Sequence, residues 1–268
     1  MPKSAHSMYK WSFLTLLLLM PPLSGTLAAT PEEKGLAIVT KADKLDTGWK
    51  DQKADMTMVL RNRQGEESTR SIRIRTLEVT GDGDKSLTIF DTPRDVKGTA
   101  FLSHTHATTP DDQWLYMPSL KRIKRISSAN KSGPFMGSEF AYEDLSSQEI
   151  EKYTYKWLRD ETLNGKETFV IEHYPQYKGS GYKRLTVWVD KKIYRPLKIE
   201  FFDRKNAPLK TLTFTGYQQY EGSYYRPDQM KMVNRQTGKS TVLAWENYEF
   251  GTGLEDSDFN KNVLKREW

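Results

Sequence analysis

The chain has 268 residues, with 41 lysines and arginines against 35 aspartates and glutamates, and it contains no cysteine. A net charge of +6 spread along the chain, with one short basic run and no long one, disfavours nucleic-acid binding, and the absence of cysteine excludes disulfides and thiol catalysis. The length suits one large β domain or two small ones and allows a real hydrophobic core.

Residues 1–29 have the order of a secretory signal peptide. Lys3 and Lys10 precede an apolar run over 11–20, two prolines follow, and Ala28 and Ala29 are small residues suited to cleavage. About ten apolar residues are too few to span a bilayer, which needs about 20. We expect cleavage near Ala28 or Ala29, which removes two lysines and no acid and lowers the net charge from +6 to +4. No cysteine follows to carry a lipid anchor, so residues 30–268 are expected in the periplasm as a single soluble domain.

The first element expected in the mature chain is a helix over residues 31–45. Pro31 and the two glutamates after it suit a first turn, and Leu36 lies on an apolar stripe. A second segment, 146–158, begins like a capping box but ends with alternating aromatic residues that favour a strand, so its assignment stays open.

Most of the remaining chain predicts short strands separated by turn-forming clusters. One block covers 56–60, 68–80, 87–90, 98–106 and 113–117, and a second covers 167–174, 182–189, 195–202, 209–217, 225–233 and 240–248. Within 68–80 the period of two places Arg70, Ile72, Ile74 and Thr76 on one face. The nearly even spacing predicts a mainly β fold, an antiparallel meander of roughly ten or more strands rather than βαβ units.

A twisted sheet of this size curls, and its interior must be filled by side chains, a plug or a ligand. The helix over 31–45 is a candidate plug. Candidate lining residues for a lipid cavity are Met56, Met58, Ile72, Ile74, Phe90, Phe101, Trp188, Phe214 and Met232. Trp114, Met230 and Trp245 are also expected to face the interior. The alternative is that these residues form an ordinary core.

An unusual segment separates the two strand blocks. Its four cations, a candidate surface for docking to head groups or a partner, are Lys121, Arg122, Lys124 and Arg125. The loop after them carries the exposed-looking side chains Phe135, Met136 and Phe140, which together with Leu36 are candidates for a lid. The alternative is a solvated edge strand followed by a loop whose aromatic residues fold back on the core.

Motifs for catalysis are few. His104 and His106 have a spacing that can chelate a metal, but only His173 remains as a third imidazole, and Asp111 with Asp112 follows a proline that favours a turn. The chain lacks a Gly-x-Ser-x-Gly elbow, a P-loop and a dinucleotide-binding glycine pattern. We therefore expect no enzyme activity, no metal and no cofactor.

Several stretches resemble the bacterial outer membrane lipoprotein-sorting proteins, which are similar in fold to the LolA and LolB carriers. These stretches are Lys34-Gly-Leu-Ala, Ala54-Asp-Met-Thr-Met-Val-Leu, Gly98-Thr-Ala-Phe, Gln113-Trp-Leu-Tyr-Met-Pro, Lys121-Arg-Ile-Lys-Arg-Ile-Ser, Gly133-Pro-Phe-Met-Gly-Ser-Glu-Phe, Tyr142-Glu-Asp-Leu and Arg195-Pro-Leu-Lys. The resemblance covers essentially all of the mature chain. It implies a curved, incompletely closed antiparallel β-barrel with one or two capping or plug helices around an apolar cavity for acyl chains. It also implies an inner-membrane RND-type exporter as donor or acceptor, and it supplies no catalytic residues.

The expected function is therefore a periplasmic carrier that shuttles a lipid or lipoprotein between inner-membrane machinery and the outer membrane, with transient membrane contact and no nucleic acid. The alternative is a periplasmic accessory subunit of an RND-type exporter that carries nothing. A third possibility is a hydrolase that uses Asp111, Asp112 or the His104 and His106 pair. The sequence does not name the cargo, the partner, the direction of transfer or the oligomeric state.

Overall fold

The computed structural model describes Met1 and residues 28–266, so most of the predicted signal peptide lies outside the described residues. Within the described part, one α-helix, α1 (Pro31–Lys44), precedes thirteen strands. The strands are β1 (Asp51–Arg61), β2 (Glu67–Leu77), β3 (Lys85–Thr92), β4 (Ala100–His104), β5 (Asp112–Met117), β6 (Arg122–Ile126), β7 (Tyr153–Leu163), β8 (Lys166–Pro175), β9 (Tyr182–Asp190), β10 (Pro196–Asp203), β11 (Pro208–Tyr220), β12 (Tyr224–Asn234) and β13 (Ser240–Phe250). Short 3₁₀-helices are η1 (Pro118–Leu120), η2 (Ser128–Asn130), η3 (Phe135–Gly137), η4 (Tyr142–Leu145), η5 (Ile150–Lys152), η6 (Asp256–Phe259) and η7 (Lys261–Lys265).

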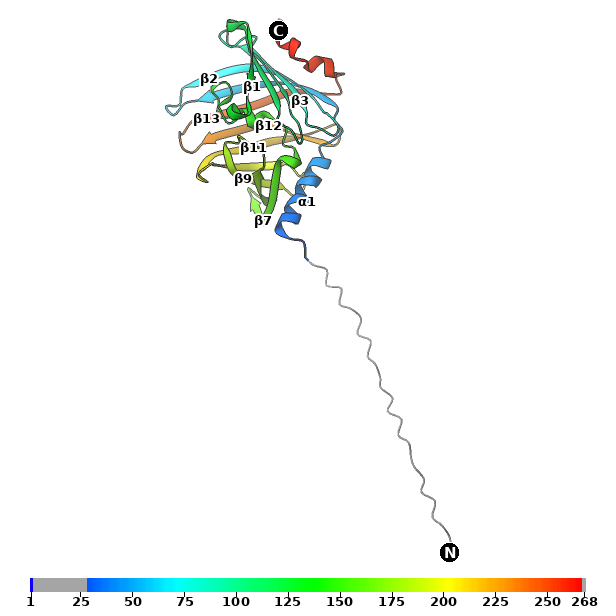
Figure 1. Ribbon diagram of the computed structural model, residues 1–268. Coiled ribbons are helices and arrows are strands. Elements are labelled where there is room, and N and C mark those ends of the chain that lie inside the picture. Colours follow the sequence, from blue (N-terminus) through cyan, green and yellow to red (C-terminus); the bar gives the residue numbers. More distant parts are fainter. Residues whose placement is uncertain (2–27, 267–268) are drawn as a thin grey trace.

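All thirteen strands belong to one antiparallel sheet, in the order β6-β5-β4-β3-β2-β1-β13-β12-β11-β10-β9-β8-β7. The sheet is curved, as Figure 1 shows, but it does not close, because β6 and β7 are its two edges and do not pair. The fold is therefore mainly β, and the expected curved, incompletely closed antiparallel sheet is confirmed. Residues 127–152 connect the two edges. The structure also decides the assignment of segment 146–158, which the sequence leaves undecided: its residues from Tyr153 onward belong to strand β7.

The concave face of the sheet carries the main core. Cross-strand partners such as Met56 and Ile72, or Met58 and Leu243, are buried side by side on this face. The alternation predicted for 68–80 is confirmed, because Ile72 and Ile74 join this core whereas Arg73 pairs with Asp91 on the opposite face.

The convex face has a smaller core of its own. The 3₁₀-helices η6 and η7 near the C-terminus, red in Figure 1, place Phe259, Val263 and Leu264 against Leu87 and Leu102 of β3 and β4. Each of these five side chains is at most 1% exposed. The final segment thus covers apolar surface that the outer side of the sheet would otherwise expose to water.

Helix α1 covers the edge of the sheet at β7. Thr30 caps it, since its hydroxyl accepts a hydrogen bond from the Glu33 N–H at 3.1 Å and the Glu33 carboxylate accepts one from the Thr30 N–H at 2.8 Å. A Cβ at Gly35 would lie 2.8 Å from the Trp157 backbone nitrogen, so glycine lets the helix rest directly on β7. Ile38 then reaches the main core.

The plug of the concave face is residues 133–145 and not α1, which corrects the sequence-based prediction. Pro134 and Ala141 form an isolated bridge, and the Phe135 N–H donates to the Phe140 carbonyl at 2.7 Å. This compact loop inserts Phe135 between Phe90 and Phe101, with ring centroids 5.9 and 5.2 Å away. The core of the molecule is thus completed by a connection rather than by a helix.

Two tryptophans predicted to face the interior lie on the convex face. Trp114 packs with the outer core, and Trp188 alternates with Val187 and Val189, which belong to the concave core. Trp188 is covered instead by the Lys198 ammonium, 3.5 Å from its ring centroid, and its indole N–H donates to Glu161 at 3.1 Å. The assignment of Trp188 to the cavity was wrong because this strand is buried on both faces.

Candidate functional site

Two adjoining cavities lie on the concave side of the sheet. The smaller, about 270 Å³, is apolar on its sheet side, where Met56, Met58, Ile74, Met230 and Trp245 line it, and the plug residue Phe135 covers it. The larger, about 580 Å³, lies between α1 and the sheet. Their linings share Thr76, Asp84 and Ser147, so the two spaces meet at these residues.

Eight of the nine candidate cavity residues lie on the concave face, and Trp188 is the exception. Met56, Met58 and Ile74 line the smaller cavity directly. Ile72, Phe90, Phe101, Phe214 and Met232 are packed into the core around it. The structure thus brings these eight side chains together on one face of the sheet.

Of the four candidate lid residues, only Phe135 lines the smaller cavity. Phe135 and Phe140 are each 1% exposed and Met136 is partly buried, so these side chains are not exposed, and the alternative in which the aromatic residues of the loop fold back on the core is correct. Leu36 is 47% exposed on the outer side of α1, so it does not face the cavity. In α1 it is Val39 and Ala42 that line the larger cavity. A lid built from α1 would therefore use these two residues.

Polar side chains hold the plug in place from distant strands. Arg70 of β2 donates to the Met136 carbonyl at 2.6 Å, and Lys210 of β11 donates to the Glu139 carbonyl at 3.0 Å and to Asp144 at 2.6 Å. Met136 has a positive φ of 50°, a strained conformation for a non-glycine residue, and the bond from Arg70 stabilises it. The plug is therefore fastened to both halves of the sheet.

The larger cavity contains titratable groups with shifted pKa values. Burial raises the pKa of Asp84 to about 7; nearby Glu149 and Glu78 add to the shift, and a 3.2 Å hydrogen bond from the Val79 N–H opposes it. Burial lowers the pKa of His173 to about 3, and its Nε2 has no hydrogen-bond partner among the described residues. His173 is thus neutral near neutral pH, whereas Asp84 is about half protonated at pH 7 and loses its proton as the pH rises further.

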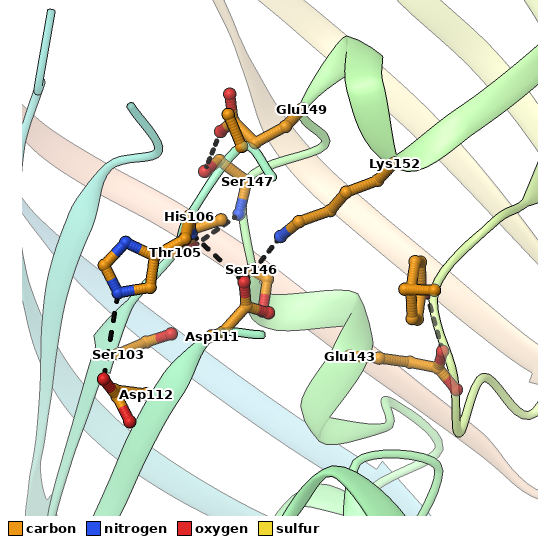
Figure 2. A network of polar contacts seen from close by, with 12 residues as sticks. Ser103, Thr105, His106, Asp111, Asp112, Glu143, Ser146, Ser147, Glu149 and Lys152 are labelled. Atoms are coloured by element: carbon orange, nitrogen blue, oxygen red, sulfur yellow. Dashed lines mark hydrogen bonds and ion pairs between the residues drawn. The ribbon is translucent and has the colours of Figure 1, made fainter. Parts of the chain in front are cut away.

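A separate ion-pair cluster lies between the β4–β5 loop and the connection 127–152, and Figure 2 shows Asp111, Ser146 and Lys152 of this cluster. Asp111 precedes β5, and its carboxylate binds Lys152 at 2.6 Å and also Lys131. Ser146 donates to the same carboxylate at 3.1 Å. Burial alone would raise the pKa of Asp111, but the two lysines hold it below its usual value. Sequence reasoning missed both lysines, which lie 20 and 41 positions from Asp111 and follow no recognisable spacing.

The two histidines do not form a metal site. His104 Nε2 lies 2.7 Å from the Phe259 carbonyl, whereas His106 lies beyond the strand and its Nδ1 is 2.7 Å from Asp82. No group of three or more His, Asp or Glu side chains within residues 28–266 is arranged to hold a metal ion. Asp112 pairs with Arg125 and lies 3.8 Å from His106 Nε2, whereas Asp111 pairs with two lysines, so the adjacent aspartates have different ion-pair partners.

The four candidate docking cations lie in and beside the edge strand β6. All four side chains are exposed, and the register places Arg122 and Lys124 on one face of the strand and Arg125 on the other. Only Arg125 has an ion-pair partner, Asp112, within the part of the chain that the structure describes. An unpaired edge with this charge is protected from pairing with another strand and is open to anionic partners.

Comparison with known proteins places the chain among solved structures of similar fold. An outer membrane lipoprotein-sorting protein domain from Vibrio parahaemolyticus is 61% identical, with a TM-score of 0.86, over 88% of this chain and 100% of that one. A DUF1329 family protein from Desulfovibrio piger is 28% identical, with a TM-score of 0.83 and the same coverage. A LolA superfamily protein from Nitrosomonas europaea is 22% identical, again over 88% of this chain and 100% of that one, and its TM-score of 0.68 shows a shared fold.

Two further comparisons complete these findings. A family model described as that of an uncharacterized protein matches residues 82–266. No curated protein matches the chain.

In the described part of the chain, no helix is both long and apolar enough to cross a lipid bilayer.

Proposed function

Because the chain belongs to the outer membrane lipoprotein-sorting protein family, we propose that it is a periplasmic carrier for the acyl chains of a lipid or lipoprotein. In this proposal the protein accepts its cargo at the inner membrane, from machinery such as an RND-type exporter, and releases it toward the outer membrane. The family and the LolA-like fold support a carrier-like role in binding lipoprotein rather than catalysis.

The observation that carries the proposal is the pair of adjoining cavities on the concave face. Their volumes, about 270 and about 580 Å³, fall in or near the range of about 300–1,000 Å³ that is typical of sites for small molecules. The methionines at the sheet side, Met56, Met58 and Met230, are flexible and adapt to apolar ligands of variable shape. An elongated apolar chain that enters between α1 and the sheet would reach these methionines.

Transfer of a free acyl chain through water is slow enough to require a carrier. At about 0.8 kcal/mol for each buried CH₂, exposing a chain of about fourteen to sixteen carbons costs on the order of 10 kcal/mol. A cavity that covers the chain removes most of this cost. Release then requires only an acceptor that binds the chain more favourably.

The test is a charge placed in the cavity. Ile74→Glu introduces a carboxylate into the smaller cavity, whereas Thr69→Glu places the same charge on the exposed, opposite face of β2. We expect the first variant to bind a fluorescent fatty acid at least about tenfold more weakly, because a chain would have to desolvate the charge, and the second to bind like the parent. Equal affinity in folded Ile74→Glu and in the parent would contradict the cavity assignment.

One observation favours the non-carrying alternative, an accessory subunit of an exporter. Phe135 and Phe140 already fill part of the concave face, so the smaller cavity holds a full acyl chain only if the plug moves. Organic extraction of protein purified from its native host, followed by mass spectrometry, separates the two functions. Lipid in near-stoichiometric amount supports the carrier, and protein that is consistently empty supports the accessory subunit.

A further inference from the structure

A third cavity, about 480 Å³, lies at the opening between the two edges of the sheet, outside the concave core. The β4–β5 loop lines it from one side and Tyr153, Gln176 and Tyr177 line it from the other. Lys131, Lys152 and Asp111 are part of its wall. The ends of the connection 127–152 therefore meet in this cavity, at the ion-pair cluster of Figure 2.

The cluster carries an excess of positive charge in a buried place. The Lys131 and Lys152 side chains are 6% and 10% exposed, and they share a single carboxylate that is 3% exposed. Two cations and one anion leave a net charge of +1. A buried charge without a partner is costly, so this arrangement favours the arrival of one more anion.

Within residues 28–266, neither of the other acidic side chains in the lining forms an ion pair or hydrogen bond with Lys131 or Lys152. Glu143 accepts hydrogen bonds from the Tyr177 hydroxyl at 2.9 Å and the Gly181 N–H at 2.8 Å, and burial raises its pKa. Glu151 is exposed to solvent.

Each lysine has hydrogen-bond donors for which residues 28–266 offer no acceptor besides Asp111, and these donors point to the same kind of ligand. Asp111 is saturated, because Lys152 and the His106 N–H bind one of its oxygens while Lys131 and Ser146 bind the other. Each ammonium has three N–H donors, and its hydrogen bond to Asp111 uses one. Two ammonium groups held at one point, with donors to spare, suit an oxyanion with several acceptors, such as a phosphate.

The cavity also adjoins the apolar space of the core. Ser146 and Ser147 line both this cavity and the smaller concave cavity. They lie between η4 and η5, where the chain has no regular secondary structure. A molecule with a charged head and apolar chains could thus place its head beside the lysines of this cavity and its chains in the smaller concave cavity, with the two serines between them.

We propose that this cavity binds the anionic phosphate of a lipid head group, with Lys131 and Lys152 as its cationic ligands, while the acyl chains pass Ser146 and Ser147 into the concave cavity. The proposal rests on the carrier function and specifies its cargo as a lipid with a phosphate near its chains. Inorganic phosphate has the same chemistry, so the experiment includes it as a separate probe.

Two substitutions change the charge of the site in opposite directions. Lys152→Gln leaves a balanced pair of Asp111 and Lys131, so the fold should tolerate it while the excess charge is lost. Asp111→Asn raises the excess from +1 to +2, so the protein should be less stable without an anion and gain more stability from one. Lys231→Gln, an exposed lysine of β12 outside the cavities, is the control for a change in net charge.

The assay measures extraction of fluorescent phosphatidic acid and of fluorescent diacylglycerol with the same chains from neutral vesicles, and the shift in melting temperature with inorganic phosphate. We expect the parent and Lys231→Gln to prefer phosphatidic acid by at least about tenfold, the worth of one or two charge-assisted hydrogen bonds. Lys152→Gln should lose the preference, and Asp111→Asn should show the largest shift with phosphate. If Lys152→Gln does not fold, Lys131→Gln and Asp111→Asn still test the site.

The outcomes separate this inference from the carrier function. Equal extraction of the two lipids by the parent would overturn the head-group site and leave the carrier intact. Extraction of neither lipid would overturn both. A phosphate shift that depends on Lys152, without preference for phosphatidic acid, would assign the site to free phosphate and overturn the head-group proposal.

Discussion

Replacing Phe135 by alanine tests whether the plug is anchored by its aromatic side chain. Phe135 is 1% exposed and lies 5.2 Å from Phe101, 5.5 Å from Tyr142 and 5.9 Å from Phe90, measured between ring centroids. Truncating a buried phenylalanine costs about 3–5 kcal/mol, which includes the loss of aromatic pairs worth about 0.5–1.5 kcal/mol each. The value of about 3–5 kcal/mol is an upper bound on the loss in free energy of unfolding, because a plug that undocks leaves no cavity in the core.

Urea unfolding and limited proteolysis together distinguish these cases for Phe135→Ala. A loss of about 3–5 kcal/mol without new cleavage means that the plug stays docked around a cavity. A smaller loss with rapid cleavage within 133–145 means that the plug undocks, and the loss then equals its docking free energy. Leu120→Ala, at a side chain that is 57% exposed, is the control and should change stability by less than about 0.5 kcal/mol. A loss below about 1 kcal/mol without new cleavage would refute the reasoning, because Phe135 would then anchor nothing.

Three further predictions concern pH, docking and the convex face. Because burial raises the pKa of Asp84 from 3.8 to about 7, the stability that its proton provides is full below pH 3.8 and is lost as the pH rises through about 7. Urea unfolding should therefore find Asp84→Asn more stable than the parent at pH 8, by about 1–2 kcal/mol after allowance for partial exposure. An equal gain at pH 3.5 would show that the gain does not come from removing a buried carboxylate charge. The basic edge is tested by replacing four side chains with glutamine: Lys121, Arg122, Lys124 and Arg125. This variant should dock more weakly to anionic vesicles, by up to about 1 kcal/mol for each cation at low salt and by less for the paired Arg125. If its docking in a sedimentation assay depends on salt as the parent's does, this edge is not the docking surface. Phe259→Ala should lower the free energy of unfolding by about 3–5 kcal/mol, since this side chain is fully buried against the convex face, and a change below 1 kcal/mol would show that η6 and η7 are not part of the cooperative fold.

Much of the sheet could be predicted from the sequence because alternation along a strand is a local property. Strand β2 alternates charged and apolar residues, so Ile72 and Ile74 were placed on the correct face. In β9 the run Leu185 to Val189 is buried throughout, and without alternation the direction of Trp188 could not be read from the sequence.

The plug and the ion-pair cluster depend on contacts between residues far apart in the chain. The loop around Phe135 is rich in glycine and serine and therefore resembles an exposed connection. Its position is set by Arg70 and Lys210, which lie 66 and 71 residues from the carbonyl groups they bind. Asp111 precedes a strand, where a turn was the reasonable expectation, and only the folded chain brings two lysines to it.

The open form of the sheet follows from the charges of β6 at one edge and from the helix that covers β7 at the other. Pairing of β6 with β7 would bury Arg122 and Lys124 against the core face, at a cost of several kcal/mol for each unpaired charge, and α1 already occupies the other edge. The gap is therefore spanned by residues 127–152, and the same connection supplies both the plug and the two buried lysines. Lys131 and Lys152 lie on that connection and are tied to Asp111, so we expect a cargo that displaces Phe135 to disturb these ion pairs as well. We therefore expect loading of the concave cavity and binding at the ion-pair cluster to be coupled, with an anionic head group offsetting the contacts that the moving plug gives up.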